Sequence, residues 1–267
     1  MSLHRQIFSN TIIQIAGKVG STALNLFAFA LMTRELGQGG FGEYTTVVTF
    51  LSFFAVVADL GLTLVTVQMI SNKQKEKEEI ILGNLFGLRL VSALFFIGLA
   101  PMIVFGLNYS AGVKIGVIIA AASFIFTALN QIMVGLFQNR LKMDRVAWAE
   151  TLSRFILIIG VIMTIKWRWG LSGMLWATSA ASCASFILHF LFARRFAHIR
   201  PRFEKYWWKK IISLSWPLAV TITFNLIYLR ADTLILSLIK SPEAVGLYGA
   251  AYKIIDVLSS LPLCSPA

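Results

Sequence analysis

The sequence contains little charge, and acidic residues are the scarcer kind. Only 13% of the 267 residues are charged, and Asp and Glu number 12 against 24 Lys and Arg. Soluble domains carry about 25% charged residues, so this chain has too little charge to solvate a globular surface. The two cysteines, Cys183 and Cys264, both lie in apolar stretches, which predicts neither a disulfide framework nor a zinc site.

Patterns typical of catalysis are also missing from the sequence. It contains no Ser/His/Asp set, no clustered metal ligands and no phosphate-binding glycine loop. The three histidines, His4, His189 and His198, are scattered, and we expect His189 to lie at the membrane interface without a role. No outer loop exceeds nine residues. The sequence therefore predicts neither an enzyme nor a bound cofactor.

Long apolar stretches dominate the chain, of which 57% is hydrophobic. A helix needs about 20 apolar residues to cross a hydrocarbon core of roughly 30 Å. Continuous runs of this length favour helices over the alternating strands of a membrane barrel. The sequence thus predicts an all-α, polytopic membrane protein with spans at 11–33, 43–70, 80–106, 111–137, 147–166, 170–193 and 211–239, and an eighth at 244–263.

The net charge of +12 is explained by topology. With the N-terminus placed inside, 14 of the 24 basic residues fall in inner segments, five in outer loops and five within spans. Cytoplasmic loops are enriched in Lys and Arg, so the bias predicts a cytoplasmic N-terminus. It also removes the need for a nucleic-acid partner.

A repeat divides the chain into two halves. Gly42 and Tyr44, after the first span, recur as Gly246 and Tyr248 after the seventh, at an offset of 204 residues. Six intervening spans are an even number, so the repeat should be parallel, related by an axis along the membrane normal. We expect a six-helix bundle over 1–193, a basic cytoplasmic linker over 194–210, and the first two helices of a second bundle over 211–267. On this interpretation the chain is truncated after about eight helices of a protein of roughly 400–500 residues.

Two polar stripes lie on the spans that the repeat relates. Their members follow the spacing i, i+4, i+7 and i+11, which places each set on one helix face. Such stripes can line a shared central cavity between two bundles, or form interhelical hydrogen bonds. With a lysine and an aspartate included, the cavity is the favoured interpretation. The stripes are Gln14, Lys18, Ser21 and Asn25, and Thr221, Asn225, Tyr228 and Asp232.

Ionisable residues within spans are costly and usually functional. Arg89 could either line the cavity or extend its guanidinium to the inner interface. Asp59 could be a proton or cation site, or a structural partner for a base. Glu150 and Arg154 are four residues apart and can neutralise each other. The embedded bases are Lys18, Arg89, Arg154, Arg230 and Lys253, and the embedded acids are Asp59, Asp232 and Asp256.

Several dispersed motifs stand out beside the repeat: Leu36-Gly37, Phe41-Gly42-Glu43-Tyr44, Asp59-Leu60-Gly61, Asp232 and Val245-Gly246-Leu247-Tyr248 with Ala251-Tyr252. Together they resemble the polysaccharide transporter family, the O-antigen-type lipid-linked oligosaccharide flippases of the multidrug/oligosaccharidyl-lipid/polysaccharide exporter superfamily. The resemblance implies a MATE-like architecture of two bundles with 12 to 14 spans.

The resemblance also implies a cargo and a mechanism. The cargo is an undecaprenyl-pyrophosphate-linked oligosaccharide, an O-antigen, capsule or exopolysaccharide unit, moved across the bacterial inner membrane by alternating access. Membrane lipids and polysaccharide polymerase or assembly proteins would be partners. The five embedded bases are the expected pyrophosphate ligands, because cations attract a pyrophosphate strongly at low dielectric. The expected sugar ligands are Gln14, Ser21, Asn25, Asn225 and Tyr228, and the expected ion-coupling residues are Asp59, Asp232 and Asp256.

Three other functions fit the sequence. A flippase for the peptidoglycan lipid precursor would need the same cationic chemistry. A multidrug or cation antiporter of the superfamily fits less well, since a cation binder should have more acids than bases in its cavity. The third is a membrane assembly subunit that transports nothing.

Overall fold

The computed structural model describes residues 3–70, 75–197 and 199–260. This part of the chain is helical and contains no strand, which confirms the predicted all-α class. The helices are α1 (Leu3–Asp59), α2 (Leu62–Ile70), α3 (Lys75–Phe105), α4 (Ala111–Asn139), α5 (Met143–Trp167), α6 (Gly170–Ala193), α7 (Lys205–Ile239) and α8 (Pro242–Ser260).

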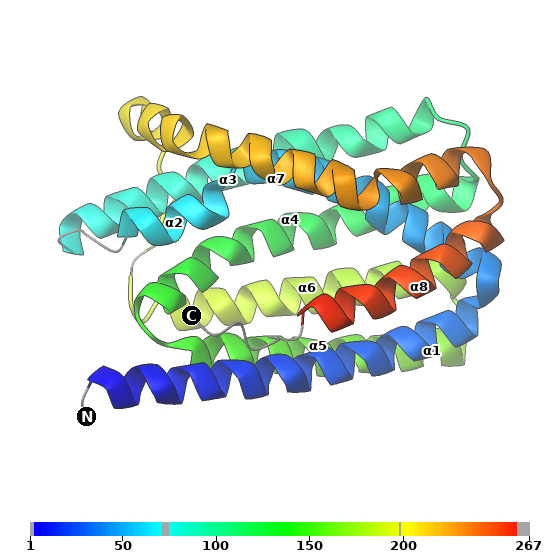
Figure 1. The fold of residues 1–267 in the computed structure, drawn as a ribbon, viewed down its shortest axis with the longest axis horizontal. Helices are drawn as coiled ribbons and strands as arrows, with labels where there is room; N and C mark the ends of the chain where they lie inside the picture. Colours follow the sequence, from blue (N-terminus) through cyan, green and yellow to red (C-terminus); the bar gives the residue numbers. More distant parts are fainter. Residues whose placement is uncertain (1–2, 71–74, 198, 261–267) are drawn as a thin grey trace.

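Helix α1 contains a sharp turn that folds it into two antiparallel arms (Figure 1). The turn is at Gly37, whose φ of 64° and ψ of −174° are non-helical. Glycine adopts positive φ without the penalty that a Cβ imposes. We call residues 3–36 the first arm and residues 38–59 the second arm. The two predicted spans at 11–33 and 43–70 therefore begin as one kinked helix.

The helices run back and forth between two ends of the molecule. In Figure 1 the N-terminus, the α4–α5 turn and the α6–α7 connection lie at one end, here called the proximal end. The α1 turn and the α3–α4, α5–α6 and α7–α8 turns lie at the opposite, distal end. Within the described residues, six helices are long and apolar enough to cross a membrane, the first being Val19–Ile70, and α8 is outside this set.

The predicted continuous span at 43–70 is wrong in one respect, because the helix breaks between α1 and α2. Leu60 and Gly61 have positive φ angles of 48° and 72°. A Cβ on Gly61 would lie 3.0 Å from the backbone nitrogen of Ala219 in α7. The break thus lets α7 approach the first bundle closely.

Apolar side chains pack the helices in three clusters. One lies toward the proximal end, where Leu82, Leu85 and Leu136 of α3 and α4 meet Ile211 of α7. A second joins the second arm of α1 to α3 and α4, and a third joins the first arm to α5 and α6. In water, such packing is driven by burial of apolar surface, at about 25 cal/mol per Å² of area removed from water. In lipid, the helices are held together instead by close van der Waals contact.

The repeat appears in the structure as a symmetric contact between α1 and α8. A Cβ on Gly42 would lie 3.0 Å from the backbone nitrogen of Gly246, and the reverse distance is also 3.0 Å. The same Cβ would clash with the carbonyl oxygen of Pro242, while a Cβ on Gly246 would clash with that of Gln38. Pro242 is 204 residues after Gln38, as Gly246 is after Gly42. The two clashes are therefore related by exchange of the repeats.

Two more contacts follow the same offset. A Cβ on Gly39 would lie 3.1 Å from Oε1 of Glu243, and one on Gly249 would lie 2.7 Å from Oγ1 of Thr45. Pairing of equivalent positions in register is the pattern of two parallel helices about a two-fold axis that runs along them. The Gly-x-Tyr repeat thus marks the place where two repeat-related helices touch.

Candidate functional site

A cavity of about 570 Å³ lies between the first bundle and the α7–α8 hairpin. Helices α1, α4, α5, α6, α7 and α8 all contribute to its wall. Three of the wall residues are basic, namely Arg154 of α5, Arg230 of α7 and Lys253 of α8. Among the described residues, the wall includes no Asp or Glu. The cavity is therefore cationic.

Two of these bases are oriented by aromatic rings. The guanidinium carbon of Arg230 lies 5.4 Å from the ring centroid of Tyr252, and Nζ of Lys253 lies 5.5 Å from that of Phe29. Cation–π contacts of this length contribute about 0.5–2 kcal/mol depending on desolvation. They hold the two cationic groups at the cavity wall.

Hydroxyl groups cover much of the remaining wall. Thr45, Thr49 and Ser52 come from the second arm of α1, and Thr127 and Thr178 come from α4 and α6. The sequence analysis missed all of them. The first three follow the spacing i, i+4 and i+7, so the periodicity used for the two predicted stripes could have found this third one.

Asp232 does not belong to the cavity wall but joins α7 to α8. Its Oδ2 accepts hydrogen bonds from the hydroxyls of Tyr248 and Tyr252, the latter at 2.7 Å. Its Oδ1 accepts the backbone N–H of Thr233 at 2.6 Å. Such bonds to a carboxylate are charge-assisted and strong. The predicted ion-coupling role of Asp232 stays a prediction, while its contacts show a residue that ties the hairpin together.

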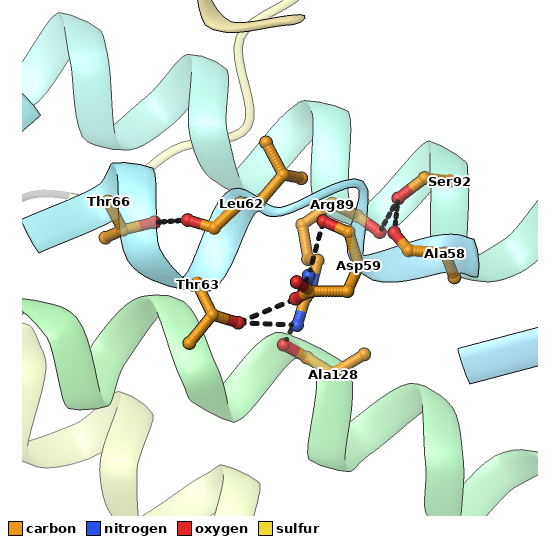
Figure 2. Close-up of polar contacts among 8 residues, drawn as sticks. All are labelled: Ala58, Asp59, Leu62, Thr63, Thr66, Arg89, Ser92 and Ala128. Atoms are coloured by element: carbon orange, nitrogen blue, oxygen red, sulfur yellow. Dashed lines mark hydrogen bonds and ion pairs between the residues drawn. The ribbon is translucent and has the colours of Figure 1, made fainter. Parts of the chain in front are cut away.

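Asp59 and Arg89 form an ion pair within the first bundle (Figure 2). Neither residue belongs to the cavity wall. Nη1 of Arg89 contacts the Asp59 carboxylate and donates at 3.0 Å to the Asp59 carbonyl. Nε donates to the carbonyl of Ala128 at 3.0 Å, and Nη2 to Oγ1 of Thr63 at 3.3 Å. The side chains are only 4% and 13% exposed. Arg89 thus caps the end of α1, where helix carbonyls would otherwise be unsatisfied.

This geometry bears on the alternatives left open for the two residues. For Asp59, it favours the structural partner over the ion site. The donors of Arg89 bind groups of α1, α2 and α4, and its role as a ligand for the cargo stays a prediction. The sequence analysis allowed a basic partner for Asp59 but did not identify it as Arg89.

The other predicted ligands are divided among several environments. Asn25 lines the cavity with the three bases. Ser21 is buried outside its wall. Asn225 and Tyr228 are exposed, because α7 turns its Leu226–Arg230–Thr233 face to the cavity instead. Their role in binding stays a prediction. Gln14, Lys18 and Asp256 have side chains outside the described part of the structure.

A second, smaller pocket of about 170 Å³ adjoins the cavity inside the first bundle. The two share Arg154, Thr127, Leu157, Thr178 and Ser182. His189 is 1% exposed and borders this pocket, so it faces the inside of the bundle. Its helix carries polar residues at i, i+4, i+7 and i+11, a stripe that periodicity could have revealed: Thr178, Ser182, Ser185 and His189.

Comparison with solved structures shows the fold. The chain is similar to a MATE protein solved in complex with Br-NRF, at a TM-score of 0.67 and 15% identity over 95% of this chain and 64% of that one. It is also similar to an outward-facing multidrug resistance MATE family transporter of the MOP superfamily, at 0.62 and 14% over 97% and 61%. A third is a MOP superfamily transporter from Pyrococcus furiosus Vc1 (DSM3638), at 0.58 and 13% over 97% and 67%.

These structures share the MATE fold with the chain, which spans only 61% to 67% of their lengths. A search of curated proteins gave no match. The model of one family, described as polysaccharide biosynthesis protein, matches residues 7–264. Because that match covers nearly the whole sequence, the chain belongs to the polysaccharide biosynthesis protein family.

Proposed function

We propose that the protein moves a polyprenyl-pyrophosphate-linked oligosaccharide from the inner to the outer leaflet of a bacterial cytoplasmic membrane. The observation that carries this proposal is the cavity wall, with Arg154, Arg230 and Lys253 and no acid among its described residues. A pyrophosphate is an anion whose attraction to cations grows as the dielectric falls. The family, which is one of polysaccharide biosynthesis, supports a glycan as the rest of the cargo.

The chemistry of the wall suits the parts of such a cargo. Arginine offers planar, paired donors that match phosphate oxygens. The hydroxyls of Thr45, Thr49 and Ser52 can bind sugar hydroxyls. The lipid tail would remain in the bilayer, so that only the polar head needs the cavity.

The contacts between the repeats support alternating access. The α1–α8 contact at Gly42 and Gly246 lies in the first turns of α8, which follow the distal turn. It would close the cavity on that side, and rocking of one bundle against the other would open it. With the N-terminus in the cytoplasm, as the basic loops favour, the distal end is the outer face. Asp232 and Asp256 remain our candidates for coupling an ion to this motion.

The peptidoglycan lipid precursor is the nearest alternative cargo, because it has the same pyrophosphate. A cation or drug antiporter is less favoured, since the wall would repel a cationic substrate. An assembly subunit without transport would have no need of a cationic cavity.

The test is extraction of lipid-linked glycans from cells depleted of the protein. We expect a pyrophosphate-linked unit of a surface polysaccharide to accumulate in the inner leaflet, with loss of the surface polymer. Re-expression of the wild-type gene should restore the polymer, and a gene encoding Arg230→Gln should restore less. Accumulation of the peptidoglycan precursor would move the protein to the alternative cargo. If neither accumulates, the proposal fails.

A further inference from the structure

The small pocket beside the cavity is polar on nearly every side, although it lies inside a bundle of membrane helices. It is bordered by α4, α5 and α6, and only Val134, Leu157 and Ala181 among its wall residues are apolar. Polar side chains facing one another at this depth are expensive unless they have partners or bind something. The pocket is therefore a candidate binding site in its own right.

The wall of this pocket is rich in hydrogen-bond acceptors. Thr127, Ser153 and Thr178 donate their hydroxyl hydrogens to carbonyls of their own helices, at 2.8, 2.8 and 2.9 Å. A hydroxyl has one hydrogen and two lone pairs. With its hydrogen used, each of the three can only accept from a ligand.

Two buried residues add acceptors. Nδ1 of His189 lies 2.8 Å from the carbonyl oxygen of Ser185, so it carries the proton and leaves Nε2 as an acceptor. Asn130 donates its amide to Oγ of Ser185 at 3.3 Å, which leaves its Oδ1. Neither Nε2 nor Oδ1 has a hydrogen-bond partner among the described residues. Buried acceptors without partners are uncommon in folded proteins and call for an explanation.

An acceptor-rich wall suits a neutral ligand with many O–H donors. A metal ion is disfavoured, since no group of three His, Cys, Asp or Glu able to hold one occurs in the described part of the chain. Arg154 borders the pocket as well as the cavity, and with Glu150 on the same wall the formal charges of the pocket balance, which favours a neutral ligand over a cation. Carbohydrate hydroxyls are neutral donors, and the pocket volume of about 170 Å³ is on the scale of one sugar ring.

We propose that this pocket is a subsite for a sugar residue of the cargo, with Asn130 and His189 as its acceptors. The inference rests on the proposed function. It divides the cargo by hydrogen-bond polarity: the pyrophosphate, which only accepts, binds at the cationic cavity, and a sugar, which donates, enters the acceptor-rich pocket. Arg154 stands at the junction of the two.

The experiment compares two probes on the purified 267-residue chain. One is undecaprenyl diphosphate, and the other is the total lipid-linked glycan fraction from membranes of the cells that produce the protein. Native mass spectrometry measures the bound amount of each species. We expect the wild type to prefer the sugar-bearing lipid over undecaprenyl diphosphate. Asn130→Leu and His189→Leu should each reduce this preference about tenfold, as expected for one lost buried hydrogen bond to a sugar.

The controls separate this inference from the proposed function. Thr164→Val removes a buried hydroxyl that also bonds its own helix, at 2.9 Å, but lies outside both cavities, so the preference should be unchanged. Arg230→Gln should weaken both lipids equally. Equal binding of the two lipids by the wild type, or an intact preference in both pocket variants, would overturn the sugar subsite alone. Binding of neither lipid would overturn the proposed function itself.

Discussion

Arg89 and Arg230 are both arginines embedded in apolar spans, and the structure uses them in opposite ways. Arg89 donates to Asp59, Ala128 and Thr63 and is almost fully buried. Arg230 borders an open cavity, where it lies against the ring of Tyr252. The first has its charge neutralised by the protein, and the second borders the space that a ligand would enter.

The difference shows that an embedded base is not by itself a sign of a binding site. Arg89 lies beside a helix break, where the carbonyl of Asp59 has no helical partner and needs a donor. Arg230 lies in the continuous part of α7, away from the helix ends. Loss of the first should damage the fold, and loss of the second should damage binding.

The largest effect is expected from breaking the Asp59–Arg89 pair. Asp59→Ala leaves a buried guanidinium without its carboxylate, and such a loss typically costs about 3–5 kcal/mol. We expect a large fall in the free energy of unfolding, measured by circular dichroism in detergent with increasing denaturant. The double variant Asp59→Ala/Arg89→Leu removes both charges and should recover part of the loss. A stable Asp59→Ala protein that no longer transports would instead restore Asp59 as an ion-coupling residue.

A smaller effect is expected at the contact between the repeats. In Gly42→Val the new side chain would clash with the backbone of α8, and overpacking of this kind costs about 1–3 kcal/mol. Gly98→Val in α3 is the matched control, because a Cβ there meets nothing within 4 Å. The melting temperature in detergent should fall for the first and stay near wild type for the second. Equal melting temperatures would mean that α1 and α8 do not touch at this point.

The cavity side of the comparison predicts a loss of affinity without a loss of stability. Arg230→Gln should bind undecaprenyl diphosphate about tenfold more weakly, a change of about 1.4 kcal/mol, while its unfolding free energy stays near wild type. Arg230→Lys keeps the charge but not the paired donors, so its affinity should lie between those of the wild type and Arg230→Gln. Titration calorimetry on detergent-solubilised protein measures the affinity of each variant, and denaturant unfolding measures its stability. A destabilised Arg230→Gln would place Arg230 with Arg89 as a structural residue.

Much of the fold could be predicted from the sequence, because span length and apolarity are local properties. The offset between Gly42 and Gly246 also identified two helices that touch. The face of α7 could not be predicted in this way. Its polar stripe predicted that Asn225 and Tyr228 line the cavity, whereas in the structure both are exposed and Arg230 lines it. Rotation of a helix depends on contacts with its neighbours, which single-helix periodicity does not contain.

Pairings between distant residues could not be predicted from the sequence either. Asp59 and Arg89 are 30 residues apart, and nothing in the spacing of either indicates the other. The break at Leu60–Gly61 lies between them in the chain, at a point where α7 packs closely against Gly61. The hydroxyls of the cavity were different, since Thr45, Thr49 and Ser52 form a stripe at i, i+4 and i+7 that is visible in the sequence.

The smallest effect separates the two roles of Tyr252, which donates a hydrogen bond to Asp232 at 2.7 Å and presents its ring to Arg230. Tyr252→Phe removes only the hydroxyl, and Asp232 keeps Tyr248 and Thr233, so the unfolding free energy should fall by about 0.5–1 kcal/mol. Affinity for undecaprenyl diphosphate should not change, because the ring remains. Tyr252→Leu removes the ring too and should weaken that affinity as well, by calorimetry. If both variants bind equally well, the ring does not orient Arg230, and the charge alone makes this residue a ligand.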